Sequence, residues 1–426
     1  MNVTILFVVL VVFAFFAAHL IQRYASRVMP ISGAEYLVIG ALIGPHIPPR
    51  VLTAEALASL APLVSLLLGL SGFLIGLQAT RNFREVRLSL AGLGLALSTL
   101  VAVAMVFAAL HGWLVAVEEP PLIHQWLFEL AGYQVEVLLT RPQAAVALVI
   151  GAIATVTFSA TLSGRGRERL EDVPAFRLLR SYAFSGQVVA ICVVAAVLAW
   201  SRSSVTDRIA VPPAAWFAAV PSLGVALGFC FSLFIGSEQS ASRIFVVTIG
   251  TVTFGAGIGA ELGVSSLFVN LVAGATVGLT LQHRGNLQRE LSRLEYPASV
   301  LLLMLTGALW VPPEGALLWL FPVVYLPSRW LARMSLPALW TRLGTRIDPT
   351  RVGTGLLGQG TPAVAIAVDY ALQVPEGSGI VLTTAIVGTL VFDIVGRRAL
   401  ERYLLGAEAE SGVLGEANWP ADEASA

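Results

Sequence analysis

Long apolar segments recur along the whole chain and limit what it can fold into. A membrane-spanning helix needs about 20 largely apolar residues, and fewer where the helix is broken. Only 12% of the 426 residues are charged, whereas soluble domains average about 25%. The sequence therefore predicts an all-α polytopic membrane protein with about thirteen transmembrane helices. The predicted spans are 4–21, 34–47, 60–79, 88–110, 143–163, 181–200, 212–235, 244–260, 262–282, 297–312, 315–331, 353–373 and 379–396.

The least regular part of this pattern is the apolar run 244–282, which is too long for one crossing. We divide it at GAELG, residues 259–263, because glycine together with a charged residue favours a turn. The first span has no basic residue before it, unlike a secretory signal peptide, so we predict an uncleaved span with its N-terminus outside.

The distribution of arginine tests this topology. All 26 basic residues are Arg. With the N-terminus outside, 22 of them fall on the inside, and the outer connections hold only Arg50, Arg141, Arg202 and Arg208. The positive-inside rule predicts this asymmetry, and one missed span would destroy it. We therefore expect a multi-pass protein of the cell (inner) membrane with a cytoplasmic C-terminus.

Two similar segments indicate an internal repeat. The second span contains LVIGALIG (37–44) and the ninth contains LVAGATVG (271–278), with five of eight positions identical. Each carries a G-x-x-x-G pair, which by itself indicates only close helix packing. In the predicted topology the two spans run in opposite directions, as in transporters built from inverted repeats. The repeats would comprise spans 2–6 and 9–13.

Such a repeat predicts that the fifth and twelfth spans correspond, and both contain residues that break helices. The fifth contains ATVTFSAT (154–161), and the twelfth contains LLGQGTPAVA (356–365). Glycine and proline weaken or interrupt a helix, although Thr and Ser can also bond back to their own helix. Unwound backbone within a membrane survives only where protein or a watery cavity satisfies it. Two broken helices that cross would direct their helix ends at a central site.

At this point the chain resembles the cation/proton antiporter superfamily, in particular its sodium/proton and potassium-efflux antiporter branch. The segments EYLVIGALIGP, LLLGLSGFLIGLQAT and LLGQGTPAVAIA carry the resemblance, which extends over nearly all of residues 30–400. It implies a transmembrane domain over residues 1–405, with a mobile core of spans 4–6 and 11–13. It also implies dimerisation mainly through spans 1–3 and 8–10, and hence a homodimer.

The chain departs from this family in the sixth span. The family carries an ion-site Asp there, but the matching segment AFSGQVVAI has Ser185, Gly186 and Gln187 at the possible positions. An amide can coordinate a cation but cannot release a proton. A basic residue that the family has in the eleventh span is matched by Arg329, although Arg329 could also lie at the inner membrane face, like Arg333.

Other intramembrane acids could replace the missing carboxylate, because such residues are functional candidates by default. Asp369, in the twelfth span, is the candidate proton carrier. Asp393 could pair with Arg397 one helical turn later, Glu261 is placed at an outer turn, and Glu35 could line an inner funnel. The predicted ion site consists of Thr155, Thr157, Ser159, Ser185, Gln187, Gln359 and Thr361.

These observations favour a secondary-active monovalent cation/proton antiporter with a non-standard ion site. Two alternatives remain: a non-transporting relative that serves as a membrane subunit or sensor of an unidentified protein, and a transporter of an anion or neutral solute. No cofactor, metal or enzyme motif is predicted, and the balance of 26 acidic against 26 basic residues does not favour nucleic acid. Residues 406–426 are predicted to form an acidic, disordered cytoplasmic tail.

Overall fold

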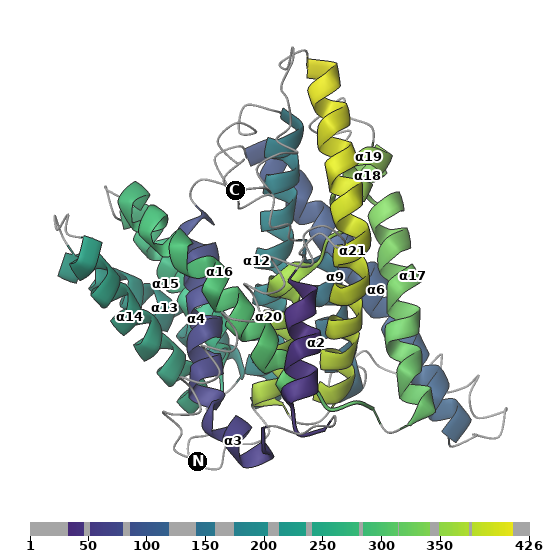
Figure 1. Ribbon diagram of the computed structural model, residues 1–426, viewed down its shortest axis with the longest axis horizontal. Coiled ribbons are helices and arrows are strands. Elements are labelled where there is room, and N and C mark those ends of the chain that lie inside the picture. The colour runs from purple at the N-terminus through teal and green to yellow at the C-terminus, as the bar shows by residue number, and fades with distance from the viewer. Residues whose placement is uncertain are drawn as a thin grey trace, which may run out of the picture.

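The computed structural model describes residues 33–46, 52–79, 86–118, 142–157, 174–202, 213–235, 241–280, 284–313, 315–340, 349–374 and 377–411. These residues form helices joined by short connections, without a β-strand among them (Figure 1). The elements are α2 (Ala34–Ile43), α3 (Ala54–Ser59), α4 (Ala61–Leu77), α6 (Val86–Glu118), α9 (Pro142–Thr155), α12 (Pro174–Arg202), α13 (Pro213–Ile235), α14 (Ala241–Leu262), α15 (Ser266–Thr280), α16 (Arg284–Leu309), the 3-10 helix η1 (Ala316–Trp319), α17 (Leu320–Ser335), α18 (Pro337–Trp340), α19 (Pro349–Gly355), α20 (Gly360–Gln373) and α21 (Ser378–Ser411).

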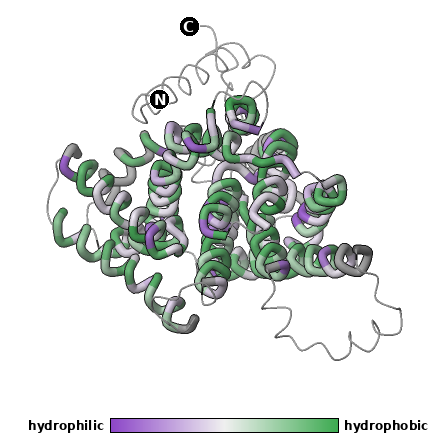
Figure 2. The backbone as a smooth tube through the Cα atoms, turned by 90° about the horizontal axis from the view of Figure 1, so that it is seen from below, coloured by the Kyte–Doolittle hydropathy of each residue, from purple (hydrophilic) through white to green (hydrophobic). Residues whose placement is uncertain are grey.

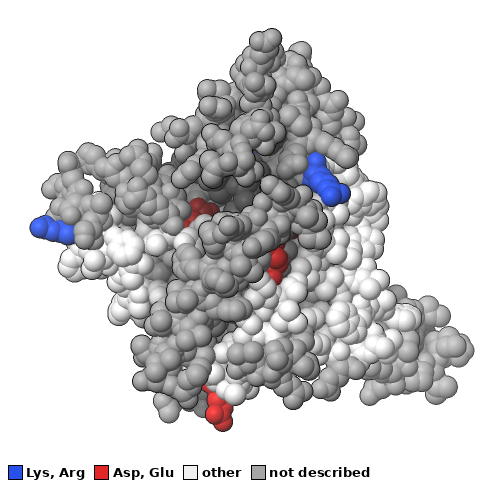
Figure 3. All heavy atoms as spheres, viewed as in Figure 1, with Lys and Arg blue, Asp and Glu red and all other residues white. Residues whose placement is uncertain are grey.

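Five helices among the described residues are long and apolar enough to cross a membrane: Arg87–Trp113, Ala175–Ser201, Ala215–Ile235, Arg243–Leu262 and Ser378–Leu400. Four shorter apolar helices accompany them. Hydrophobic positions dominate along most helices (Figure 2), and most of the described surface seen in Figure 3 is uncharged. A multi-pass membrane protein accounts for these features. The count of thirteen spans stays a prediction, and the first predicted span lies outside the described residues.

The predicted division of the run 244–282 agrees with the structure. Helix α14 ends at Leu262 and α15 begins at Ser266. Between them Gly263 has a φ of 61°, a left-handed conformation that favours glycine. The N–H of Val264 donates to the carbonyl of Gly259 at 2.9 Å and closes the turn.

The helices divide by their contacts into two groups. One contains α2, α4, α13, α14, α15 and α16, and the other contains α6, α9, α12, α17, α19, α20 and α21. In Figure 1 the first group occupies the left and centre, and α17 and α21 stand side by side at the right. The division of the spans into a dimerisation domain and a mobile core stays a prediction.

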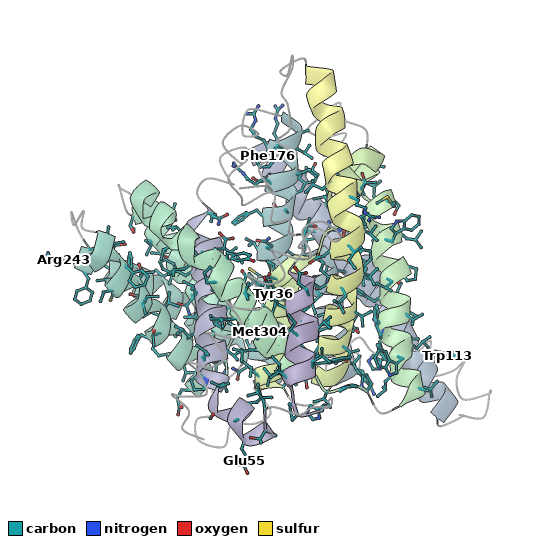
Figure 4. All side chains as sticks on the ribbon, viewed as in Figure 1. Tyr36, Glu55, Trp113, Phe176, Arg243 and Met304 are labelled. Carbon is teal, nitrogen blue, oxygen red and sulfur yellow. The ribbon has the colours of Figure 1, made fainter. Side chains whose placement is uncertain are left out.

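The two glycine motifs pack helices at very short range. A Cβ atom added at Gly40 of α2 would lie 2.0 Å from the backbone oxygen of Met304 in α16, and one at Gly274 of α15 would lie 2.2 Å from that of Phe73 in α4. Figure 4 shows Tyr36 and Met304 near each other where α2 meets α16. Helix α2 thus packs closely on α16, and α15 packs closely on α4. The inverted repeat itself stays a prediction.

The C-terminal helix is longer than predicted. We predicted that a disordered tail begins at residue 406, but α21 continues to Ser411. The segment GAEAE at 406–410 alternates alanine and glutamate, which are good helix formers, so the helix propagates past the membrane-spanning part. Residues 412–426 lie outside the described residues.

Candidate functional site

The predicted break in the twelfth span is present between α19 and α20. Helix α19 ends at Gly355, and α20 begins at Gly360 after a short non-helical stretch. Gly360 has a φ of 66°, which a residue with a side chain rarely adopts. Pro362 follows in the first turn of α20, where its missing N–H removes no helical hydrogen bond.

A second break lies directly against the first. Helix α9 ends at Thr155, and Val156 and Thr157 continue without helical structure. The Thr157 hydroxyl donates to the backbone oxygen of Leu356 at 3.0 Å. We call the two contacting segments, residues 154–157 and 356–360, the crossing. The continuation of the fifth span beyond residue 157, including Ser159, lies outside the described residues.

Helix α12 closes one side of the crossing with the segment in which the family resemblance places the missing Asp. The Thr155 hydroxyl donates to the Gly186 backbone oxygen at 2.9 Å, and the Gln187 side-chain amide donates to the Thr157 backbone oxygen at 3.1 Å. A Cβ atom at Gly186 would lie 2.2 Å from the Thr155 backbone oxygen, so only glycine fits. Ser185 is buried but bonds within α12, to the Ser181 backbone oxygen.

Arg329 fills the centre of the crossing from α17. Its guanidinium donates to the backbone oxygens of Ala154 at 3.2 Å, Val156 at 2.8 Å and Leu357 at 2.6 Å, and more weakly to Gly358 at 3.5 Å. It is wholly buried and lies 4.4 Å from the centre of the Phe392 ring. A single side chain thus satisfies carbonyl groups from both broken helices, which is what unwound backbone in a membrane requires.

Arg333 lies one turn further along α17 and joins the same network. It is 2% exposed, and its guanidinium donates to the backbone oxygens of Ala154 and Thr155. The comparison of Arg333 with an arginine at the membrane face is therefore wrong. The i to i+4 spacing places Arg329 and Arg333 on one face of α17, and both point into the crossing.

Asp393 of α21 supplies a carboxylate at the crossing. One of its oxygens accepts the backbone N–H groups of Gln359 at 2.9 Å and Gly360 at 2.8 Å, which are the first amides of α20. It also interacts electrostatically with Arg329 and with Glu35 of α2. The suggested partner Arg397 has a side chain outside the described part of the structure.

Two polar side chains lie against each other beside the crossing. The Gln359 amide is wholly buried, and it interacts with the buried hydroxyl of Tyr325 from α17. Both side chains lie against Gly388 of α21, where a Cβ atom would be 2.7 Å from the Gln359 oxygen. These two groups add an amide oxygen and a hydroxyl oxygen to the buried polar atoms near the crossing.

Asp369, the predicted proton carrier, is not part of this network. It accepts a hydrogen bond from the Ser265 hydroxyl at 2.5 Å and interacts with the backbone amides of Ser266 and Leu267 at the start of α15. Nine residues of helix separate it from Gly360, or about 14 Å along α20. The structure thus brings together Thr155, Thr157, Gln187, Gln359 and Arg329, and it leaves Asp369 apart.

Three further predicted residues have other positions. Thr361 is half-buried in the first turn of α20, beside the crossing. Glu261 is exposed near the end of α14, and Glu35 is half-buried in the first turn of α2. Sequence reasoning missed Arg333 and the contact of Asp393 with α20. For Arg333 the sequence signal was its spacing of four residues from Arg329, which places both on one helix face. For Asp393 the signal was an acidic residue inside an apolar span.

The hydroxyl that joins the two breaks has a measurable effect on stability. We expect Thr157→Val to lower the free energy of unfolding in detergent by about 1–3 kcal/mol, because the buried Leu356 oxygen loses its donor. Thr99→Val is the matched control, since the buried Thr99 hydroxyl bonds only to Leu95 within its own helix. Thermal unfolding curves of both variants would measure the difference. Equal destabilisation would show that the contact between the breaks adds no stability.

Comparison with known proteins bears on the fold. No protein-family model matches the sequence, and no curated protein matches it. Two solved structures of the sodium/proton antiporter MjNhaP1 from Methanocaldococcus jannaschii are similar. The structure at pH 8 superposes with a TM-score of 0.63 at 15% identity, covering 98% of this chain and 99% of the other. The structure from an electron-microscopy map gives a TM-score of 0.61 at 16% identity, covering 98% and 100%.

The chain shares the fold of this sodium/proton antiporter over nearly its whole length. This confirms the all-helical, antiporter-like fold class that the resemblance implied. The sequence identity of 15% shows the fold alone, so the ion site of this antiporter fold has to be argued from its own residues.

Proposed function

We propose that the protein is a secondary-active monovalent cation/proton antiporter-like transporter with a non-standard ion site at the crossing. The meeting of the two broken helices supports this proposal most strongly. Thr157 bonds to the backbone of the other break, and Arg329 bonds to carbonyl groups of both. Unwound backbone of this kind is costly within a membrane, and transporters use it to build ion sites.

The proposed site uses the polar groups of the crossing and their neighbours. Thr155, Thr157 and Gln187 hold α12 against the break, and Gln359 and Thr361 begin α20. Ser159 and Ser185 complete the set proposed from the sequence. We further propose a homodimer in the cell (inner) membrane with the N-terminus outside and the C-terminus in the cytoplasm.

One observation favours a second function, that of a membrane subunit or sensor without transport. The carbonyl oxygens that could coordinate a cation at the crossing are already bonded to Arg329 and Arg333. A transported cation would have to compete with these two guanidinium groups. A locked crossing would preserve the fold without any movement of ions.

Exchange in proteoliposomes separates the two functions. A pH-sensitive dye inside the vesicles would report the change in internal pH after a pulse of Na⁺, K⁺ or Li⁺. The assay would be repeated in buffers from mildly acidic to mildly alkaline pH, with protein-free vesicles as the control. We expect a cation-dependent change in internal pH for at least one ion. A folded protein that gives no response to any of the three ions would contradict the antiporter proposal and support the subunit.

A further inference from the structure

We propose that Asp393 is the carboxylate at which protons and cations compete in this protein. This inference rests on the proposed antiporter function and names its exchanging group. The family resemblance places that carboxylate on the sixth span, but α12 contains neither Asp nor Glu. The chain would supply it instead from α21, on another side of the same crossing.

The position of Asp393 distinguishes it from the other buried acid. Asp393 touches the crossing itself through the amides of Gln359 and Gly360. Asp369 is held by the Ser265 hydroxyl at the start of α15. Each aspartate caps the start of a helix other than its own. Asp369 caps α15, and Asp393 caps α20 at the break that separates α19 from α20.

The groups around Asp393 suit a small cation. The side-chain amide of Gln359 and the hydroxyl of Tyr325 are buried next to each other, and Asp393 accepts the backbone N–H of Gln359 itself. The carboxylate, amide and hydroxyl oxygens all carry lone pairs that can coordinate a cation. The first amides of α20 are already bonded to Asp393, which disfavours an anion at this helix N-terminus.

Charged side chains from two elements act on Asp393. Among the described side chains, Arg329 from α17 and Glu35 from α2 interact with it electrostatically, and the amides of α20 complete its surroundings. A bound proton and a bound cation offset the same negative charge of Asp393, so they compete for it.

Glu35 also provides a direction of access. It is half-buried in the first turn of α2, and α2 packs against α21. Figure 4 places Tyr36, the next residue, at the upper end of α2. On the predicted topology this end of α2 faces the cytoplasm. A cation that arrives by this route would displace the proton of Asp393 to the same side.

The test compares Asp393→Asn with Asp369→Asn. Asparagine is as good a helix cap as aspartate, so both variants keep an acceptor for the amides but lose the titrating group. We expect Asp393→Asn to abolish proton-coupled exchange in proteoliposomes and Asp369→Asn to retain it. Exchange that persists in Asp393→Asn with an unchanged pH profile would overturn the proposal, as would loss confined to Asp369→Asn. Absence of exchange in the unmodified protein would instead contradict the proposed function.

Two further measurements keep the test decisive if Asp393→Asn folds poorly. Glu35→Gln removes the neighbouring negative charge without touching a helix cap, and we expect it to move the pH profile of exchange to lower pH. An unmoved profile would contradict the assignment of the exchanging carboxylate to Asp393. Calorimetric titration of the detergent-purified protein with Na⁺ or K⁺, in buffers with different ionisation heats, would count the protons released. We expect cation binding to release protons from the unmodified protein and from Asp369→Asn. An equal release of protons from Asp393→Asn would also overturn the proposal.

Discussion

Replacing Arg329 with methionine will destabilise the protein by about 3–5 kcal/mol, the cost of removing one partner from a buried, hydrogen-bonded charge. Methionine fills a similar volume but leaves the backbone oxygens of Ala154, Val156 and Leu357 without their donor. It also leaves Asp393 without its positive neighbour. The temperature of unfolding in detergent, followed by the loss of the monodisperse peak in size-exclusion chromatography, measures the effect.

Two variants show whether geometry or charge matters at this position. Arg329→Lys keeps the charge, but an ammonium group cannot reach carbonyl groups of both broken helices at once, so we expect an intermediate loss. Arg398→Met removes an exposed arginine of α21 and should change stability by no more than about 0.5 kcal/mol. An Arg329→Met protein as stable as the Arg398→Met control would show that other groups satisfy the crossing.

Alanine at Gly40 will separate two helices that now touch. The added methyl group would lie 2.0 Å from the backbone oxygen of Met304, and backbone cannot move aside as a flexible side chain can. Forcing an atom into a packed interface costs up to about 3 kcal/mol or more. We expect a loss of this size in the free energy of unfolding, measured in the same detergent assay.

Gly250→Ala provides the matched control for this prediction. Gly250 lies within α14, and a Cβ atom there would meet nothing within 4 Å. Since alanine favours a helix over glycine by about 1 kcal/mol, this variant should be slightly stabilised. The two substitutions of glycine by alanine should therefore change the free energy of unfolding in opposite directions. Destabilisation by both would contradict the prediction that the short contact at Gly40 causes the loss.

Much of the fold could be predicted from local patterns. Glycine and proline marked the break before Gly360 and the turn at Gly263, because their backbone preferences act over a few residues. Apolar length located most of the helices. The extension of α21 to Ser411 was missed because a tail rich in alanine and glutamate looks disordered by composition but prolongs a helix that already exists.

The site was harder to predict because its contacts join distant parts of the chain. Nothing near Asp393 in the sequence indicates that its partners are the amides of Gln359 and Gly360. Asp369 was predicted as the proton carrier because it follows the break on the same helix. It lies nine residues beyond Gly360, however, and accepts a hydrogen bond from Ser265 before the start of α15. Arg333 was assigned to the membrane face because basic residues near span ends usually lie there.

The dependence of α9 on Arg329 also has a consequence for how the protein is made. Val156 precedes Arg329 by 173 residues, so about 9 to 35 seconds of ribosomal synthesis separate the two. During that interval Arg329 has not yet been synthesised, so it cannot donate hydrogen bonds to the carbonyl groups at the end of α9. Insertion of α9 into the bilayer must therefore stay incomplete, or be shielded by water or the insertion machinery, until α17 emerges. The N-terminal half of the chain is thus expected to mature only after most of the C-terminal half has been synthesised.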